Sequence, residues 1–172
     1  MKNKITKFLA FGIPAFVFFI FFLGLGTDKT YNTRDIVNKR IDNFKLETLT
    51  GNYQITENNL IVNDYTLINF WASWCAPCRA EHKNLLLLKD NSTLKIVGIN
   101  FKDNETNAKN YLKKLGDPYQ HVLKDKSGKV AIRFGVYGIP ESILIDNNLK
   151  IIKKFIGPIT KNDYQEILKI LY

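Results

Sequence analysis

Hydrophobic and polar positions follow one another along this chain in segments that predict separate strands and helices. Phe44-Lys45-Leu46-Glu47-Thr48-Leu49 alternates with the period of a half-buried strand. The turn residues Thr50-Gly51-Asn52 follow it. Four further short apolar runs also predict strands: 65–70, 94–99, 142–145 and 151–156. The last two flank Asp146-Asn147-Asn148, which favours an antiparallel hairpin.

Apolar residues at helical spacing separate these strands. A helix is predicted from about Pro77 to Leu88, and Asn104 can cap a second helix that stops at Gly116. A short helical turn is expected at 130–134, and Thr160 can cap a last helix. The first helix joins two strands that we expect to be parallel, through a right-handed connection. Together these segments predict an α/β domain whose mixed β-sheet carries helices on both faces.

The N-terminal segment has a different pattern. No charged residue interrupts the 18 positions from Phe8 to Leu25, a length at the short end of what spans a bilayer. Lys2, Lys4 and Lys7 precede this run and predict that the N-terminus stays inside. The two interpretations are an uncleaved transmembrane anchor and a cleaved signal peptide. We favour the anchor, because the run exceeds a usual signal core and Gly24-Leu25-Gly26 is a poor cleavage site.

This pattern divides the chain into four parts. They are a cytoplasmic N-terminus (1–7), a transmembrane anchor (8–25), a polar tether (26–40) and one globular domain (41–172). The domain is then expected in an extracytoplasmic space, where disulfides persist. The net charge of +9 comes from lysines scattered among acids and asparagines. Because these lysines form no block, we predict a solvated surface and no nucleic-acid partner.

The only two cysteines, Cys75 and Cys78, stand at the junction between a predicted strand and a predicted helix. A Cys-x-x-Cys pair in this position is typical of a thioredoxin-type redox site. The free N–H groups and the dipole at the start of a helix stabilise a thiolate. We therefore expect Cys75 to attack a target disulfide and the more shielded Cys78 to resolve the mixed disulfide.

Three other interpretations of the pair are less favourable. A structural disulfide closing so short a loop restricts the unfolded chain very little. A zinc site needs about four ligands, and only His82 and His121 remain, so it would require a second chain. A peroxidatic cysteine usually follows threonine and proline, which Ala72-Ser73-Trp74 does not supply. We predict a redox pair with no metal and no cofactor.

Two blocks of sequence carry a resemblance to a known family. Residues 68–82, Ile-Asn-Phe-Trp-Ala-Ser-Trp-Cys-Ala-Pro-Cys-Arg-Ala-Glu-His, and residues 134–142, Phe-Gly-Val-Tyr-Gly-Ile-Pro-Glu-Ser, resemble the CcmG/DsbE family. Its members are membrane-anchored thioredoxin-like proteins of cytochrome c maturation. The resemblance implies a thioredoxin-like fold and a reductant of apocytochrome c disulfides. It also implies an inner-membrane protein whose domain faces the periplasm or an equivalent space, with a DsbD/CcdA-type electron donor.

The same resemblance assigns residues around the pair. Pro140 is expected in the cis form, facing the disulfide, with Ile139 beside it pairing with a substrate strand. Trp74 and Glu141 are further substrate-binding candidates, Glu141 alternatively contacting a partner protein. Glu81 is expected to act as an acid and base, or to raise the thiol pKa values by like-charge repulsion.

A difference from ordinary thioredoxins supports the assignment of Glu81. Asn69 occupies the position where thioredoxins commonly carry a buried aspartate, and an asparagine cannot accept a proton as a base. The alternative is that Glu81 is a solvated surface residue. We expect His82 to be a surface or helix-packing residue and His121 to be structural.

Two other functions stay open. One is a TlpA/ResA-like thiol reductase with other exported clients, which only the identity of its clients would separate from the first. The other is a non-catalytic module that binds an unfolded chain at the sheet edge. This second alternative predicts that Cys78→Ala leaves function intact.

Overall fold

The computed structural model describes residues 2–25, 36–51 and 53–172. The described residues fall into two units, one on each side of the division between residues 32 and 33. The first unit contains helix α1 (Lys2–Leu25). Its described side chains include exposed apolar residues such as Phe11, Phe18 and Phe21. Within the described ranges, no helix meets the combined length and hydropathy criteria for a membrane span.

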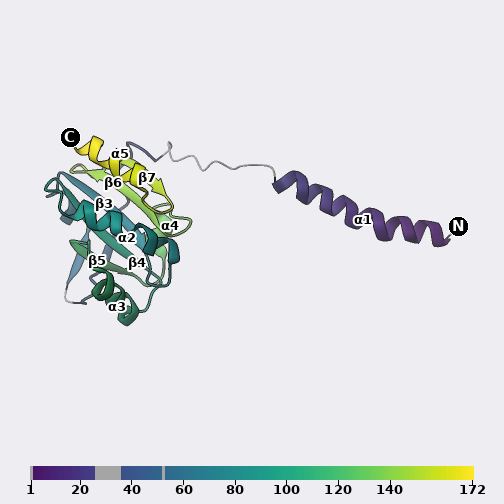
Figure 1. Cartoon of the computed structure of the whole chain (residues 1–172), viewed down its shortest axis with the longest axis horizontal. Helices are drawn as coiled ribbons and strands as arrows, with labels where there is room; N and C mark the ends of the chain where they lie inside the picture. Colours follow the sequence, from purple (N-terminus) through teal and green to yellow (C-terminus); the bar gives the residue numbers. More distant parts are fainter. Residues whose placement is uncertain (1, 26–35, 52) are drawn as a thin grey trace. The chain divides into compact units, whose positions relative to one another are not determined.

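The second unit is built on a five-stranded mixed sheet with strand order β5-β4-β3-β6-β7 (Figure 1). Its strands are β3 (Tyr65–Trp71), β4 (Leu94–Phe101), β5 (His121–Asp125), β6 (Glu141–Asp146) and β7 (Ile151–Ile156). β3, β4 and β5 run parallel, whereas β6 is antiparallel to both β3 and β7. The predicted parallel strands and the predicted hairpin are therefore both present in one sheet.

Helices pack on both faces of this sheet, as the sequence predicted. α2 (Ala76–Lys89), α3 (Glu105–Leu115) and α5 (Lys161–Leu171) share one hydrophobic core with the sheet. The short helix α4 (Lys129–Arg133) packs on the other core. That second core also includes residues of a small hairpin and its 3-10 turn: β1 (Lys45–Glu47), β2 (Gln54–Thr56) and η1 (Glu57–Leu60).

The side chains of strand β3 point alternately into the two hydrophobic cores. Leu67 and Trp71 enter the core under α2, whereas Ile68 and Phe70 enter the core under α4. Side chains of a strand point alternately to its two faces, so Asn69 shares the α2 side with Leu67 and Trp71. A polar side chain is thereby placed in an apolar layer directly beside the helix that begins with the cysteines.

Strands β2 and β5 and the 3-10 turn were not predicted. β2 is only three residues long, and His-Val-Leu-Lys-Asp in β5 shows weak alternation. Part of the predicted tether is also bound to the sheet, because Asn38 N donates to Ile151 O at 2.8 Å. Residues 26–35 of that tether, and Asn52 of the predicted turn, lie outside the described residues.

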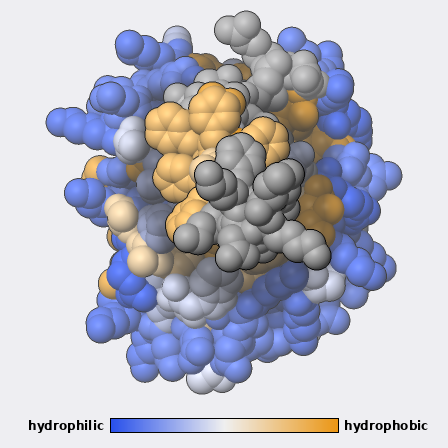
Figure 2. Space-filling view, turned by 90° about the vertical axis from the view of Figure 1, so that its right-hand side faces the viewer, coloured by the Kyte–Doolittle hydropathy of each residue, from blue (hydrophilic) through white to orange (hydrophobic). Residues whose placement is uncertain are grey.

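Toward the edges of the view in Figure 2, the visible surface is mostly hydrophilic. Some charged residues are paired: Lys124 contacts Glu47 at 3.3 Å and Glu105 at 3.1 Å. The carboxylates of these pairs stay exposed to solvent, which screens the attraction. The charge pattern is consistent with the solvated surface expected from the sequence.

Candidate redox-active site

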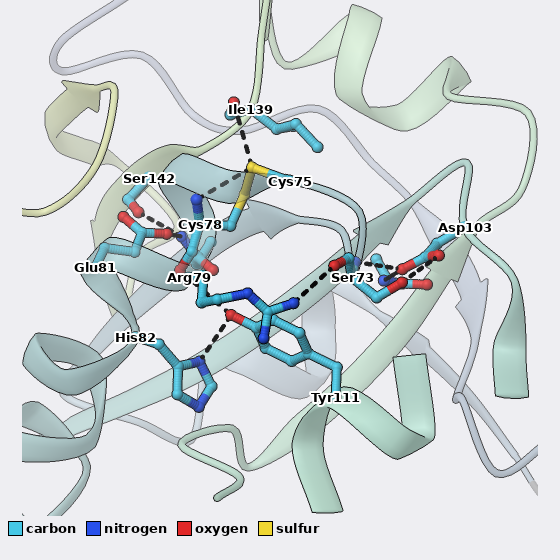
Figure 3. The surroundings of a disulfide bond; sticks show 12 residues. Ser73, Cys75, Cys78, Arg79, Glu81, His82, Asp103, Tyr111, Ile139 and Ser142 are labelled. Atoms are coloured by element: carbon cyan, nitrogen blue, oxygen red, sulfur yellow. Dashed lines mark hydrogen bonds between the residues drawn. A yellow bond between two sulfur atoms is a disulfide. The ribbon is translucent and has the colours of Figure 1, made fainter. Parts of the chain in front are cut away.

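Cys75 and Cys78 form a disulfide at the start of helix α2, with an S–S distance of 2.02 Å (Figure 3). Cys75 is the N-cap residue, and its sulfur accepts a hydrogen bond of 3.1 Å from the main-chain N–H of Cys78. Pro77 stands in the first helical turn, where its missing N–H costs little. The helix start thus directs N–H groups at the Cys75 sulfur, which favours a thiolate there once the disulfide opens.

Both cysteines are buried in this disulfide form, Cys75 with 4% and Cys78 with 2% of its surface exposed. The sulfur of Cys75 lies 3.6 Å from the carbonyl oxygen of Ile139, and the Ile139–Pro140 peptide bond is cis. The loop before β6 therefore lies against the sulfur of Cys75 (Figure 3).

The segment before Cys75 is held by an aspartate that the sequence analysis did not single out. Asp103 accepts hydrogen bonds from Ser73 N at 2.6 Å and Ser73 Oγ at 2.8 Å. Asp103 in turn accepts a hydrogen bond from Asn100, at the end of β4. Trp74 follows Ser73 in the sequence and is 60% exposed, and its indole N–H donates to the carbonyl of Lys102. An aromatic side chain therefore lies open to solvent beside the buried disulfide.

Glu81 lies on α2 one turn after Cys78, and it is 1% exposed. Its Oε1 accepts a hydrogen bond of 2.8 Å from Asn69 Nδ2, and its Oε2 accepts one of 2.7 Å from Ile159 N. Burial raises the pKa of Glu81 to about 7, although the two hydrogen bonds oppose this by favouring the carboxylate. The structure therefore places a buried carboxyl group with a pKa of about 7 on the same helix as the cysteines.

Asn69 connects Glu81 to two further buried groups. Its Nδ2 also donates to Ser142 Oγ at 3.0 Å, and its Oδ1 accepts a hydrogen bond of 2.9 Å from the hydroxyl of Tyr119. Ser142 belongs to β6, and Tyr119 precedes β5. Strands β3 and β6, helix α2 and the segment before β5 thus contribute to one buried polar cluster, of which sequence reasoning identified Glu81 and Asn69 but not Tyr119.

His82 is a helix-packing residue. Its Nε2 is 2.9 Å from the carbonyl oxygen of Gly116, and its ring makes an edge contact with Tyr111. Burial lowers the pKa of His82, so the ring is predominantly neutral at neutral pH. Tyr111 donates its hydroxyl proton to the carbonyl of Cys78 at 3.3 Å and carries the guanidinium of Arg79 above its ring. These contacts fix the first turns of α2 against α3.

Glu141, expected to contact substrate or a partner, is 3% exposed and directed inward. Its Oε2 lies 2.7 Å from Nζ of Lys154, and its Oε1 accepts hydrogen bonds from the N–H groups of Tyr137 and Gly138. A buried carboxylate needs such partners to offset its loss of hydration. The structure therefore gives Glu141 a place behind the loop that faces the disulfide. Lys154 was missed, although a lysine inside the apolar β7 segment was a signal for it.

The site contains a disulfide bond that can be reduced to two thiols, a protonatable carboxyl group and an exposed aromatic side chain. In the part of the chain that the structure describes, no three histidine, cysteine or acidic residues are arranged to hold a metal ion. The mixed sheet and a disulfide at a helix start define a thioredoxin-like thiol:disulfide oxidoreductase.

Comparison with known proteins leads to a narrower group. The Redoxin family matches residues 36–169. The chain is 36% identical over 127 residues to the thiol:disulfide interchange protein HelX of Rhodobacter capsulatus, covering 74% of this chain and 72% of HelX. It is 35% identical over 148 residues to the thiol:disulfide interchange protein DsbE of Escherichia coli, covering 86% and 80%.

A solved structure agrees with these sequence matches. The thiol:disulfide interchange protein DsbE of Chlorobium tepidum superposes with a TM-score of 0.69 at 25% identity, covering 79% of this chain and 98% of that one. The chain belongs to the Redoxin family and, within it, to the DsbE-type thiol:disulfide interchange proteins. The resemblance seen in the two sequence blocks is thereby confirmed.

Proposed function

We propose that this protein is a membrane-anchored reductant of apocytochrome c disulfides during cytochrome c maturation. The observation that carries the proposal is the Cys75–Cys78 disulfide at the start of α2, with Glu81 buried one turn further on. Membership of the DsbE-type proteins supports the client. No cofactor is required, because both electrons come from the two thiols.

The reaction begins with the protein in its dithiol form. The thiolate of Cys75 attacks one sulfur of the client disulfide, and the other client sulfur leaves as a thiolate that takes up a proton. Cys78 then loses its proton and attacks the sulfur of Cys75. The Cys75–client bond breaks, and the second client sulfur leaves and is protonated. Two electrons have passed to the client, and the protein is left with the disulfide seen in the structure.

Glu81 is the proposed acid and base for the second step. Residues three apart on a helix lie on neighbouring positions of its surface, which brings the carboxylate close to the Cys78 side chain. A base is most effective when its pKa lies near the working pH, and burial brings the pKa of Glu81 to about 7. Glu81 can thus take the proton of Cys78 and return it to the departing client thiolate.

The client binds on the face formed by Trp74 and the loop that ends at Pro140. The carbonyl oxygen of Ile139 lies next to the Cys75 sulfur, which suits main-chain pairing with an extended client segment. Tyr137 in the same loop is 78% exposed and adds a second aromatic surface. Glu141 contributes by holding this loop from behind.

We infer the location from the N-terminal segment and the family together. Residues 8–25 serve as the anchor in the inner membrane, with residues 1–7 inside and residues 26–40 as the tether. The domain from residue 41 onward then works in the periplasm or an equivalent space. A membrane thiol transporter of the DsbD/CcdA type is the proposed electron donor, and apocytochrome c or its handling proteins are the proposed clients.

A reduction assay tests this function. The reduced full chain in detergent is mixed with an oxidised peptide that carries Cys-x-x-Cys-His, and the free thiols of the peptide are counted after it is separated from the protein. We expect one client disulfide reduced per protein, with no reaction for Cys75→Ala. A peptide with the same cysteines but without the histidine is the matched control for client preference. Equal rates for the two peptides would favour a general reductase, and no reduction of either would contradict the proposal.

A further inference from the structure

The amide of Asn69 lies at the centre of the buried cluster and makes three hydrogen bonds within it. Its Nδ2 donates to Glu81 at 2.8 Å and to Ser142 at 3.0 Å, while its Oδ1 accepts from the Tyr119 hydroxyl at 2.9 Å. An asparagine amide has two donor protons on nitrogen and an acceptor oxygen. Both kinds of group are therefore used, and all three bonds form with an ionised Glu81. In the reversed orientation the Tyr119 hydroxyl could only accept from the amide, and its own proton would lose the Asn69 oxygen.

The opposite orientation of this amide would depend on the proton of Glu81. Rotated by half a turn, the amide would present Oδ1 to Glu81 Oε1. Two acceptor oxygens would then face each other unless Glu81 carried a proton to donate. One amide orientation thus stabilises the carboxylate, and the other stabilises the carboxylic acid. Whatever holds the amide in its observed orientation also favours the ionised state of Glu81.

The Tyr119 hydroxyl is suited to hold the amide in this way. The ring of Tyr119 stacks on Trp71 with the centroids 5.5 Å apart and the planes inclined by 17°. A Cβ on Gly98 would lie 2.8 Å from Cδ1 of Tyr119, so the ring has little freedom to move on that side. Burial raises the pKa of Tyr119 well above its ordinary value, and the hydroxyl therefore keeps its proton at neutral pH.

We propose that Tyr119 is a positioning residue, whose hydroxyl fixes the Asn69 amide with its NH2 group toward Glu81 and so favours the carboxylate. The proposal deepens the role of Glu81 as an acid and base and rests on that proposed function for its effect on catalysis. Tyr119 itself touches neither the cysteines' client nor the reacting sulfurs in this assignment. It acts through Asn69, which makes the hydrogen bond to Glu81.

Few other titratable groups in the described structure face Glu81. Tyr111 approaches from α3, and burial raises its pKa to about 12, which leaves it neutral. Arg79 and His82 are neighbours on α2 itself, and the cysteines do not titrate while joined. The remaining partners are neutral: the main-chain N–H of Ile159 before α5, and the hydroxyl of Ser142 on β6. Burial therefore has the largest effect on the pKa of Glu81, and neutral hydrogen bonds oppose it.

Tyr119→Phe tests the proposal by removing one hydroxyl from a ring that stays the same size. The full chain, oxidised and in detergent, is labelled with glutamate carrying ¹³C in its carboxyl group, and the Glu81 signal is assigned by its loss in Glu81→Gln. We expect the midpoint of the Glu81 titration to rise by about one pH unit in Tyr119→Phe. Tyr111→Phe is the matched control, since it removes another tyrosine hydroxyl beside Trp71 that does not bond to Asn69. Its Glu81 midpoint should stay at the wild-type value.

A double variant identifies the route of the effect. If Tyr119 acts through Asn69, then adding Tyr119→Phe to Asn69→Ala should move the midpoint no further than Asn69→Ala alone. An unchanged midpoint in Tyr119→Phe would overturn the proposal, and so would a full additional shift in the double variant. Failure of the proposed role of Glu81 is a separate result. In that case Glu81→Gln would reduce the peptide with an unaltered pH profile, while Tyr119→Phe would still move the Glu81 midpoint.

Discussion

Glu141 and Lys154 form a buried ion pair between the adjacent strands β6 and β7, with 2.7 Å between Oε2 and Nζ. Their side chains are 4% and 0% exposed. The other carboxylate oxygen accepts hydrogen bonds from two N–H groups of the loop before β6, and Lys154 donates to the carbonyl of Gly135 in the same loop. One ion pair thus supports both ends of the loop that faces the disulfide.

Removing one member of this pair should destabilise the domain strongly. Lys154→Met would leave the Glu141 carboxylate buried without its counter-charge, at a cost of about 3 kcal/mol in the free energy of unfolding. Chemical denaturation at pH 7 measures this quantity. The double variant Glu141→Gln with Lys154→Met should recover part of the loss, because neither charge then remains. Strictly additive losses would show that the two side chains do not act as a pair.

The buried carboxyl of Glu81 should make stability depend on pH. Its pKa is raised from 4.5 to about 7 in the folded protein, so between these values the folded state binds more protons than the unfolded state. The stabilising contribution is full below about pH 4.5 and is lost as the pH rises through about 7, in total about 3 kcal/mol.

Glu81→Gln is the control that isolates this contribution, because it removes the titrating group and nearly keeps its size. Denaturation curves collected between pH 4.5 and 8 should show the wild-type protein losing stability relative to the variant as the pH rises. Parallel stability profiles for the two proteins would mean that Glu81 has an ordinary pKa.

Trp74 should affect client binding and leave the fold intact. The side chain is 60% exposed, so Trp74→Ala removes little buried contact, and the free energy of unfolding should change by less than about 0.5 kcal/mol. We expect KM for an oxidised peptide to rise severalfold. Leu87→Ala removes a comparably exposed apolar side chain from the other end of α2, and its KM should stay at the wild-type value. A similar rise in both variants would argue against a binding role for Trp74.

Gly98 is a site where any side chain disturbs the buried cluster. A Cβ there would lie 2.8 Å from both Trp71 Nε1 and Tyr119 Cδ1. Gly98→Ala should lower the free energy of unfolding by about 1–3 kcal/mol, because the two rings must shift. Gly138→Ala is the control, since its Cβ would meet nothing within 4 Å. Comparable unfolding midpoints for the two variants would contradict this account of the packing.

Periodicity located most of the elements, and the motif located the cysteines, because both signals are local in sequence. The antiparallel hairpin 142–156 and the helix caps at Asn104 and Thr160 are determined by neighbouring residues. Strand β5 was missed because its five residues are held by pairing with β4 and alternate only weakly. Its place depends on a partner strand that is distant in sequence.

The supporting residues of the site could not be predicted for a related reason. Tyr119 reaches Asn69 across 50 positions of sequence, and Ser142 reaches it across 73. Nothing near Glu141 in sequence indicates that its charge is matched by Lys154 on the next strand. A carboxylate in a motif suggests contact with a client, and only the three-dimensional structure shows that this one is directed inward.

The most direct test of the central claim is to trap the mixed disulfide in the cell. Anchored Cys78→Ala is expressed in cells that make c-type cytochromes, and the polypeptides linked to Cys75 are identified by mass spectrometry after non-reducing separation. Cys75→Ala with Cys78→Ala is the control that cannot form the adduct. The account predicts that apocytochrome c or its handling proteins are captured through Cys75. If Cys78→Ala captures no client and supports cytochrome c maturation as well as the wild-type protein, the two-cysteine mechanism is contradicted.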